Sequence, residues 1–238
     1  MSIAPSASTL IRALKKSASK KDATSVSRFI KTRKGQYGEG DSFLGIRMPV
    51  LRQLAKDNMD LSLTEAVNLL KSEFHEARMT ALLILVLKFQ QEDETTQAQI
   101  VKLYLKYSAY MNGWDLVDCS AHLILGPWLM RRDKRILKNL ARSQSLWDRR
   151  IAIMSTFHFI RQQHFAPTLK IARLLLNDNE DLIHKAVGWM LREVGNRVRN
   201  TEEDFLRKYY RNMPRTMLRY AIEKFPQTRR KQYLNGTM

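Results

Sequence analysis

The feature that most constrains the fold is a helix-opening pattern that returns along the chain at a nearly constant interval. Related segments begin at Phe74, Trp114, Trp147 and Leu182, which lie 40, 33 and 35 residues apart, and a fifth apolar helix is expected over Met213–Phe225. A period of this size is typical of stacked helix pairs, in which each pair buries its apolar face against its neighbours. Residues at equivalent positions of successive pairs should therefore line one common surface.

Local helix signals agree with this period. Pro49 stands where a first-turn proline belongs, and Ser62 followed by Glu65 predicts a capping box at another helix start. Thr201 followed by Asp204 predicts a further cap of the same kind. Convincing strand alternation is absent, and the chain has only nine glycines and six prolines. The sequence thus predicts helices throughout.

Together these patterns predict the fold class all-α, in the form of a HEAT-like helical-repeat solenoid that is curved and has a basic concave face. No linker composition interrupts the chain. We therefore expect a single domain over residues 1–238, with a further N-terminal helix within about residues 1–24. The segment Thr32–Asp41, which contains three glycines, is the one long loop that the sequence indicates.

The charge balance indicates the class of partner. The 41 lysines and arginines outnumber the 23 acidic residues, which gives a formal net charge of +18 at pH 7. A polyanion is the natural partner of such a chain, because each phosphate that it neutralises releases condensed counterions. We therefore favour nucleic acid over an anionic membrane surface.

Composition also argues against several other classes. The lone Cys119 allows neither an internal disulfide nor a cysteine metal site, and the five histidines lack metal-binding spacing. The longest apolar run, Ala81–Leu87, is too short to span a bilayer, and the N-terminus does not resemble a secretory signal. No glycine-rich phosphate loop is present. We expect a protein of the cytoplasm, in a bacterial cytosol or nucleoid, with no metal and no cofactor.

At the repeated helix position, three successive pairs carry residues that suit contact with a nucleic acid. Trp114 and Asp118 are four residues apart and so share one face of a helix. The next two pairs add cations and a second indole: Arg149, Arg150, Lys185, Trp189 and Arg192. Two indoles, one carboxylate and several cations on a common surface fit a damaged nucleotide in DNA.

Plainer interpretations of the same residues stay open. Trp147 suits a packing anchor, and Trp114 or Trp189 taken singly would also suit the core. Asp118 could pair with a basic residue of the neighbouring repeat. Cys119 is better explained as a small buried residue than as a nucleophile, because no histidine partner is placed by spacing. The joint occurrence of the tryptophans, the carboxylate and the cations is what favours a functional surface.

Longer motifs resemble a known family. Five segments are similar to the AlkD family of DNA alkylation repair proteins, which are alkylpurine DNA glycosylases built from HEAT-like repeats. The likeness runs from about residue 25 to residue 235. The segments are Tyr37–Ile46, Trp114–Asp118, Leu146–Ala152, Ile183–Glu193 and Met213–Lys224.

The resemblance implies an enzyme that excises cationic N3- and N7-alkylated purines from duplex DNA by hydrolysis of the N-glycosidic bond, without flipping the base into a pocket. It implies that Asp118 is the catalytic carboxylate and that Trp114 and Trp189 lie against the deoxyribose and backbone of the lesion. It further implies DNA contacts by a set of cations and one tyrosine: Arg150, Arg192, Arg47, Arg52 and Tyr37. Arg149 and Lys185, which share the repeated helix position, complete the expected DNA-contact set.

The chemistry explains why such a site needs few groups. Breaking the glycosidic bond builds positive charge on the sugar, and a neighbouring carboxylate stabilises that charge. An N3- or N7-alkylated purine is already cationic and leaves as a neutral base, so no general acid is required. The expected partner is double-stranded DNA carrying alkylated purines, bound by a monomer. The alternative is a non-catalytic HEAT-repeat module that binds damaged or branched DNA, and a basic scaffold for RNA or proteins is a third hypothesis.

Overall fold

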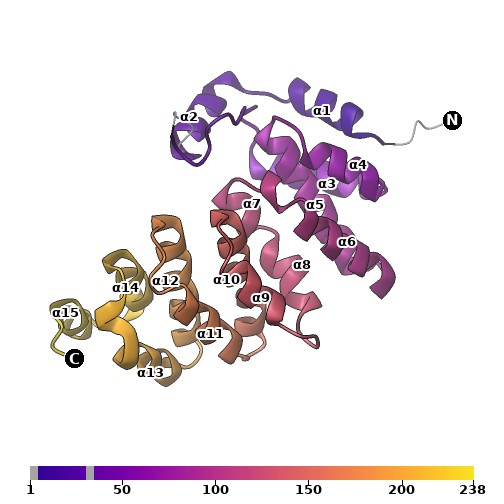
Figure 1. The fold of residues 1–238 in the computed structure, drawn as a ribbon. Helices are drawn as coiled ribbons and strands as arrows, with labels where there is room; N and C mark the ends of the chain where they lie inside the picture. Colours follow the sequence, from indigo (N-terminus) through magenta and orange to yellow (C-terminus); the bar gives the residue numbers. More distant parts are fainter. Residues whose placement is uncertain (1–4, 31–34) are drawn as a thin grey trace. The chain divides into compact units, whose positions relative to one another are not determined.

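The structure is a computed structural model that describes residues 5–30 and 35–238, and over these ranges the chain is organised by α-helices (Figure 1). The prediction of an all-α chain of helical repeats is therefore confirmed, whereas its curvature and its basic concave face stay predictions. Within the described residues, the one extended pairing is an isolated parallel bridge between Ser42 and Phe74. None of the described helices is both long enough and apolar enough to cross a membrane.

The α-helices are α1 Ala7–Lys16, α2 Lys20–Ile30, α3 Met48–Asp57, α4 Leu63–Leu70, α5 His75–Gln91, α6 Glu94–Lys106, α7 Trp114–Asp118, α8 Ala121–Trp128, α9 Arg135–Leu140, α10 Leu146–Arg161, α11 Ala166–Leu174, α12 Asp181–Gly195, α13 Arg199–Tyr209, α14 Arg215–Ala221 and α15 Gln227–Asn235. Three short 3₁₀ helices are η1 Ser108–Tyr110, η2 Tyr210–Asn212 and η3 Ile222–Lys224. The repeated opening pattern thus lies at the starts of α5, α7, α10 and α12, as the period predicted.

The chain divides by its internal contacts into two compact units, Met1–Ser120 and Ala121–Met238. The expectation of a single domain over the whole chain stays a prediction. In the first unit, α5 is the central helix, because α3, α4, α6 and α7 all contact it and α1 packs on α4 (Figure 1). Ala81, Leu82 and Ile84 of α5 are fully buried. A helix that is apolar on most sides belongs inside a core, which explains the long apolar run in the sequence.

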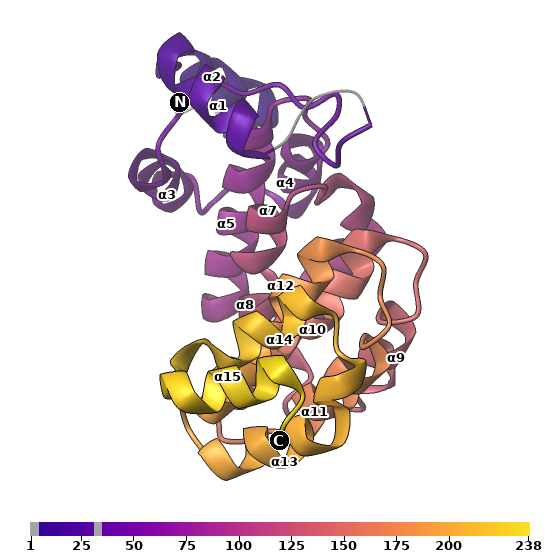
Figure 2. The same cartoon turned by 90° about the vertical axis from the view of Figure 1, so that its left-hand side faces the viewer.

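In the second unit, α10, α12 and α14 pack side by side, and α9, α11 and α13 form a second row against them (Figures 1 and 2). Close packing in the first row depends on Gly188, because a Cβ there would lie 2.4 Å from the Met217 carbonyl oxygen of α14. Gly126 has the same role between α8 and α10, where a Cβ would lie 2.7 Å from the carbonyl oxygen of Ser155. Trp147 is buried in α10, as expected for a packing anchor.

Two of the three helix starts read from the sequence occur as predicted. Pro49 lies in the first turn of α3, and Ser62 caps α4 by accepting a hydrogen bond from the backbone N–H of Glu65. The reciprocal half of the capping box is replaced by a tertiary contact. The carboxylate of Glu65 instead accepts a hydrogen bond from the backbone N–H of Ala7, across 2.7 Å, and so ties α1 to α4.

The prediction that Thr201 caps a helix is wrong. The N-cap of α13 is Val198, and Thr201 lies inside the first turn, with its backbone N–H bonded to the Val198 carbonyl. Arg199, the first residue of the helix, bonds Glu202 within it and the Lys224 carbonyl outside it, and these contacts favour the earlier start over the local cap. Tertiary packing therefore decides this boundary.

Candidate active site and DNA-contact residues

Trp114 and Asp118 stand at the two ends of α7, one helical turn apart, and both side chains are half-buried. Asp118 lies close to two titratable neighbours. Burial raises the pKa of the Tyr104 hydroxyl, and the charge of Asp118 adds to the rise. Burial, together with the charges of Asp115 and Asp118, raises the pKa of the Cys119 thiol to about 11. A thiol with such a pKa is protonated at neutral pH. The Cys119 side chain is half-buried, not fully buried as the sequence suggested.

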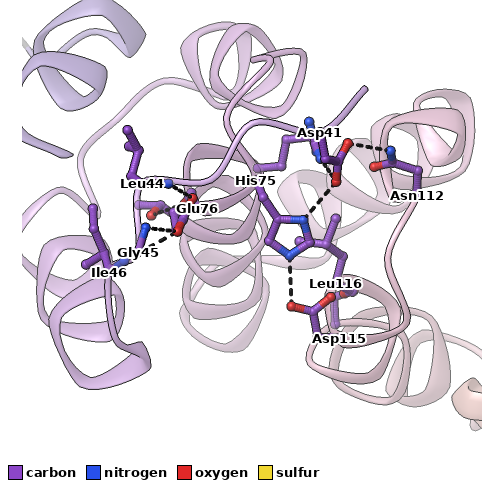
Figure 3. Close-up of polar contacts among 12 residues, drawn as sticks. Asp41, Leu44, Gly45, Ile46, His75, Glu76, Asn112, Asp115 and Leu116 are labelled. Atoms are coloured by element: carbon purple, nitrogen blue, oxygen red, sulfur yellow. Dashed lines mark hydrogen bonds and ion pairs between the residues drawn. The ribbon is translucent and has the colours of Figure 1, made fainter. Parts of the chain in front are cut away.

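A buried polar network holds the chain at the start of α7 (Figure 3). Asp115 Oδ2 lies 2.8 Å from His75 Nε2, and Asp41 Oδ2 lies 3.1 Å from the other ring nitrogen, Nδ1. Asn112 donates a hydrogen bond to Asp41 across 2.7 Å. The imidazole is nearly inaccessible to solvent and stacks on Phe43, with 4.8 Å between ring centroids. The network thereby joins three segments of the first unit that are distant in sequence.

Charges alternate along this network. Arg78 Nη2 lies 2.6 Å from Asp41 Oδ2, and the imidazole of His75 separates Asp41 from Asp115. Burial lowers the pKa of His75, but its hydrogen bonds to Asp115 and Asp41 and the charge of Asp115 raise that pKa to about 9. Burial raises the pKa of Asp41, yet the hydrogen bond from His75 and the charge of Arg78 leave it below its usual value. His75 is therefore an imidazolium between two carboxylates at neutral pH.

The donors of this network do not form a metal site. Asp41 and Asp115 approach opposite edges of the imidazole, so the three side chains cannot converge on one ion. Among the residues that the structure describes, no group of three or more histidine, cysteine, aspartate or glutamate side chains is placed to hold a metal ion.

Glu76 anchors the segment that leads into α3 (Figure 3). Its buried carboxylate accepts hydrogen bonds from the backbone N–H groups of Leu44, Gly45 and Ile46, at 2.9, 2.7 and 3.3 Å. Gly45 has a φ of 74°, a conformation that favours glycine. The next residue is Arg47, so Glu76 sets the point at which this predicted DNA contact leaves the core.

The other predicted residues of the first unit lie at its surface. Arg47 is the N-cap of α3, and its side chain is 81% exposed, with Nε 3.8 Å from Asp22 Oδ2. Arg52 is exposed on α3, and its charge opposes the rise in the pKa of the Cys119 thiol, which places it toward the end of α7. Tyr37 is half-buried in the turn at 35–40. Residues 32–34, at the start of the predicted loop, lie outside the described residues.

In the second unit, Trp189 is the indole of α12. Its side chain is half-buried, its Nε1 donates to Glu193 Oε1 across 3.3 Å, and its ring lies 6.1 Å from that of Phe157 between centroids. Trp189 is thus neither fully packed in the core nor fully exposed. The indole is held on one edge and retains accessible surface, as a contact with a ligand would need.

The two cations of α12 each have an acidic neighbour. Lys185 Nζ lies 2.7 Å from Asp181 Oδ2, and Arg192 forms an ion pair with Glu223 of η3. The side chain of Lys185 is the more accessible of the two. A phosphate would therefore compete with these carboxylates for both cations.

Arg149 and Arg150 of α10 are tied to groups of the protein. Arg149 Nε lies 2.6 Å from Asp178 Oδ2, and its Nη1 donates to two backbone carbonyls. Arg150 is only 4% exposed, and its Nη1 donates to the Leu182 carbonyl across 2.6 Å. These bonds join α10 to the start of α12. That the two arginines contact DNA stays a prediction, and their bonds within the second unit explain their presence without it.

The same bonding pattern recurs at the fourth residue of three helices. Arg78 in α5 and Arg149 in α10 each donate from Nη1 to the backbone carbonyls six and five residues earlier. His184 in α12 contacts the carbonyl of Asp178, six residues earlier, at 2.5 Å. A basic side chain therefore reaches back to the segment that enters its helix, so the repeat is visible in hydrogen bonds as well as in period.

Replacing Arg149 by lysine is expected to lower the free energy of unfolding by about 1–2 kcal/mol, because an ammonium cannot hold Asp178 with two nitrogens and also reach both carbonyls. Urea denaturation measures this change. The matched control is Arg173→Lys, at an exposed position of α11, for which we expect a change within about 0.5 kcal/mol. Equal stability of the two variants would show that Arg149 is not held by its bonds within the protein.

Three features define a protein of the helical-repeat class. They are the paired helices, the recurring side-chain bonds to the segment before a helix, and the two rows of helices in the second unit. The chain belongs to the family described as DNA alkylation repair enzyme, because residues 10–225 match that family. The resemblance read from the sequence motifs is thereby confirmed. The family indicates a role in DNA alkylation repair.

Among solved structures, the fold is similar to that of a protein described as "Predicted DNA alkylation repair enzyme from Enterococcus faecalis". The TM-score is 0.67 at 16% sequence identity, over 88% of this chain and 97% of that chain. At this identity the likeness concerns the fold. No curated protein matches the chain.

Proposed function

We propose that the protein is a DNA glycosylase that hydrolyses the N-glycosidic bond of cationic N3- and N7-alkylated purines in duplex DNA. The observation that carries the proposal is the pair on α7, where an indole and a carboxylate lie one turn apart and are both half-buried. A half-buried side chain is positioned by the protein and still accessible to a ligand. Membership of a DNA alkylation repair family supplies the class of damage.

The proposed chemistry assigns one main task to Asp118. As the alkylated purine leaves with the bonding electron pair, it becomes neutral and C1′ of the sugar becomes electron-deficient. The Asp118 carboxylate lies beside C1′ and stabilises this charge. A water molecule then adds to C1′ and loses a proton, which gives an abasic site and a free base. No proton needs to be delivered to the leaving group, because the alkyl group has already made it cationic.

The indoles and cations have supporting tasks in this proposal. Trp114 and Trp189 are assigned to the deoxyribose and backbone of the lesion, and the base is not flipped into a pocket, as the family resemblance implies. Arg47 and Arg52 contact phosphates from α3, since both are exposed there. The remaining DNA contacts are assigned to five residues that already interact with other groups of the protein and would have to bind phosphate in addition: Tyr37, Arg149, Arg150, Lys185 and Arg192. The protein acts as a monomer in the cytoplasm.

Incubation of the protein with methylated duplex DNA is expected to release free 3-methyladenine and 7-methylguanine, which chromatography separates from the polymer. An untreated duplex of the same sequence is the control and should release no base, because a neutral purine needs an acid that the proposed site does not supply. DNA without protein corrects for spontaneous loss of methylated bases.

The same experiment separates the alternative function. A non-catalytic module for damaged or branched DNA would bind the methylated duplex and release no base above the protein-free rate. That outcome, with binding intact in a gel-shift titration, would contradict the glycosylase proposal and favour the module. Failure to bind any duplex would contradict both.

A further inference from the structure

The helix that carries Trp114 and Asp118 has little intrinsic support. α7 is five residues long, and its N-cap is Gly113, which offers no side-chain cap. A helix of this length is not stable by itself, because nucleation costs more than one or two backbone bonds return. Its direction must therefore be set by contacts with the rest of the first unit.

The apolar contacts of α7 fix how deeply it is buried. Leu116 and Val117 are both fully buried. Just beyond the helix, the Ser120 hydroxyl donates to the Leu116 carbonyl across 2.6 Å and lies 2.9 Å from the Tyr104 hydroxyl. Apolar packing is not directional, so the burial of Leu116 and Val117 alone permits a small rotation of the helix about its axis, and the Ser120 bonds hold only its C-terminal end.

Directional contacts are made at the first turn (Figure 3). Asp115 is the second residue of α7 and bonds His75, the first residue of α5. Asn112, just before the helix, bonds Asp41, which also holds the opposite edge of the His75 ring. Gly113 fits between these groups so closely that a Cβ there would lie 2.9 Å from His75 Cε1. The imidazole is thus fixed at both nitrogens and aligns the first turn of α7 with the start of α5.

We infer that His75 and Asp115 are positioning residues, whose hydrogen bond fixes the rotation of α7 and so aims Trp114 and Asp118 at the bound nucleotide. The inference rests on the proposed function for the role of Asp118. That the hydrogen bond between His75 and Asp115 holds α7 in place does not depend on that function. Reacting groups must be placed to within a fraction of an ångström, and a misplacement of about 1 Å can lower a rate a hundredfold. A rotation of a short helix is enough to cause it.

Hydrogen exchange measured by NMR tests the hold on α7 directly. The backbone amides of Val117 and Cys119 bond carbonyls of α7 and its N-cap, so they report its opening. In His75→Gln they are expected to exchange at least tenfold faster than in the wild type. The amides of Lys71, which follows α4, and Tyr107, which follows α6, are the internal controls and should change less than twofold. Asp115→Asn keeps the shape of the side chain and should shift α7 in the same direction, by a smaller factor.

The outcomes of this experiment are distinct. Unchanged exchange at α7 in both variants overturns the inference. So does an equal acceleration at α4, α6 and α7, because that would be a general loss of stability. If His75→Gln does not fold, Asp115→Asn carries the test on the same amides.

The rate of base excision tests whether this positioning of α7 matters for the proposed reaction. At saturating protein, the single-turnover rate of His75→Gln is expected to fall at least tenfold, while its Kd for undamaged duplex stays within twofold. Leu14→Ala is the control, since it opens a cavity under α1, which packs on α4 and α5, and its rate per folded molecule should stay within twofold. A wild-type rate for His75→Gln overturns the inference. If the wild type itself releases no base while α7 exchange is selectively faster in the variants, the proposed function fails and the hold on α7 stands.

Discussion

Asp118→Asn is expected to lower the single-turnover excision rate at least a hundredfold, the largest effect on activity that we expect from one substitution. The amide keeps the shape of the side chain and removes only its charge. Loss of one well-placed charged stabiliser corresponds to about 2.7 kcal/mol or more of transition-state energy. Binding to undamaged duplex should persist or tighten, because a negative group near the phosphates is removed.

The competing interpretation makes the opposite prediction for the same variant. If Asp118 serves mainly as a partner of a basic side chain, Asp118→Asn should lower the melting temperature and leave excision per folded molecule nearly unchanged. Asp60→Asn, at an exposed position after α3, is the matched control and should change neither quantity. Excision by Asp118→Asn within about threefold of the wild type would show that the catalytic role is wrong.

The helices could be predicted from the sequence because their signals are local. A 3.6-residue apolar period, a first-turn proline at Pro49 and a cap at Ser62 depend on residues within one or two turns of each other. The interval between helix starts added the repeat, since equal spacing reflects equal units. The local approach failed at Thr201, because the helix begins earlier, at Arg199, which bonds Glu202 and the distant Lys224 carbonyl.

The buried network could not be predicted in the same way. The partners of His75 lie 34 and 40 residues away, and a lone histidine followed by Glu76 has no spacing that indicates either partner. Asp115 is part of the motif that begins α7, but the sequence analysis assigned the chemical role in that motif to Asp118, three residues later. Nothing local distinguishes a carboxylate that faces a substrate from one that faces a histidine on another helix.

The arginines show a second limit of sequence reasoning. Arg149 and Arg150 occupy the repeated helix position, and their charge suits a phosphate. In the structure, however, Arg149 binds Asp178 and two preceding backbone carbonyls, and Arg150 donates to the Leu182 carbonyl. A guanidinium has five donors in a planar fork, so it serves equally well to clamp a neighbouring repeat or a phosphate. The sequence held one sign of this structural role: the fourth residue is an arginine in both α5 and α10. Arg78 makes the same bonds to preceding carbonyls as Arg149 does.

The second large effect is a dependence of stability on pH that belongs to His75. Its pKa rises from 6.5 to about 9 in the folded protein, because Asp115 and Asp41 together outweigh the effect of burial. A raised pKa means that the folded state holds the proton more tightly than the unfolded state. The resulting stabilisation is fully present below about pH 6.5 and is lost as pH rises through 9. A shift of this size corresponds to roughly 2–3 kcal/mol between pH 6 and pH 9.

The groups around the imidazole support this sign. Asp41 and Asp115 face its two nitrogens from the segment before α3 and from α7, and Arg78 faces Asp41 from α5. For both carboxylates to be satisfied by the ring, both nitrogens must carry protons. Arg78, which contacts the same Asp41 oxygen as the ring does, opposes the charge on His75, but its influence on the His75 pKa is smaller than those of Asp115 and Asp41.

Urea denaturation of the wild type and His75→Gln at pH 6 and pH 9 measures the effect. We expect the wild type to lose roughly 2–3 kcal/mol more than the variant over this interval. The difference between the two proteins is needed because burial raises the pKa of Glu202 to about 8, so that carboxyl also lowers stability as pH rises over part of the interval. Glu202 lies in the second unit and is common to both proteins, so its contribution cancels. Parallel losses in the two proteins would mean that His75 is neutral between its carboxylates, as would a pKa near 6.5 in a direct NMR titration of the His75 ring in the wild type.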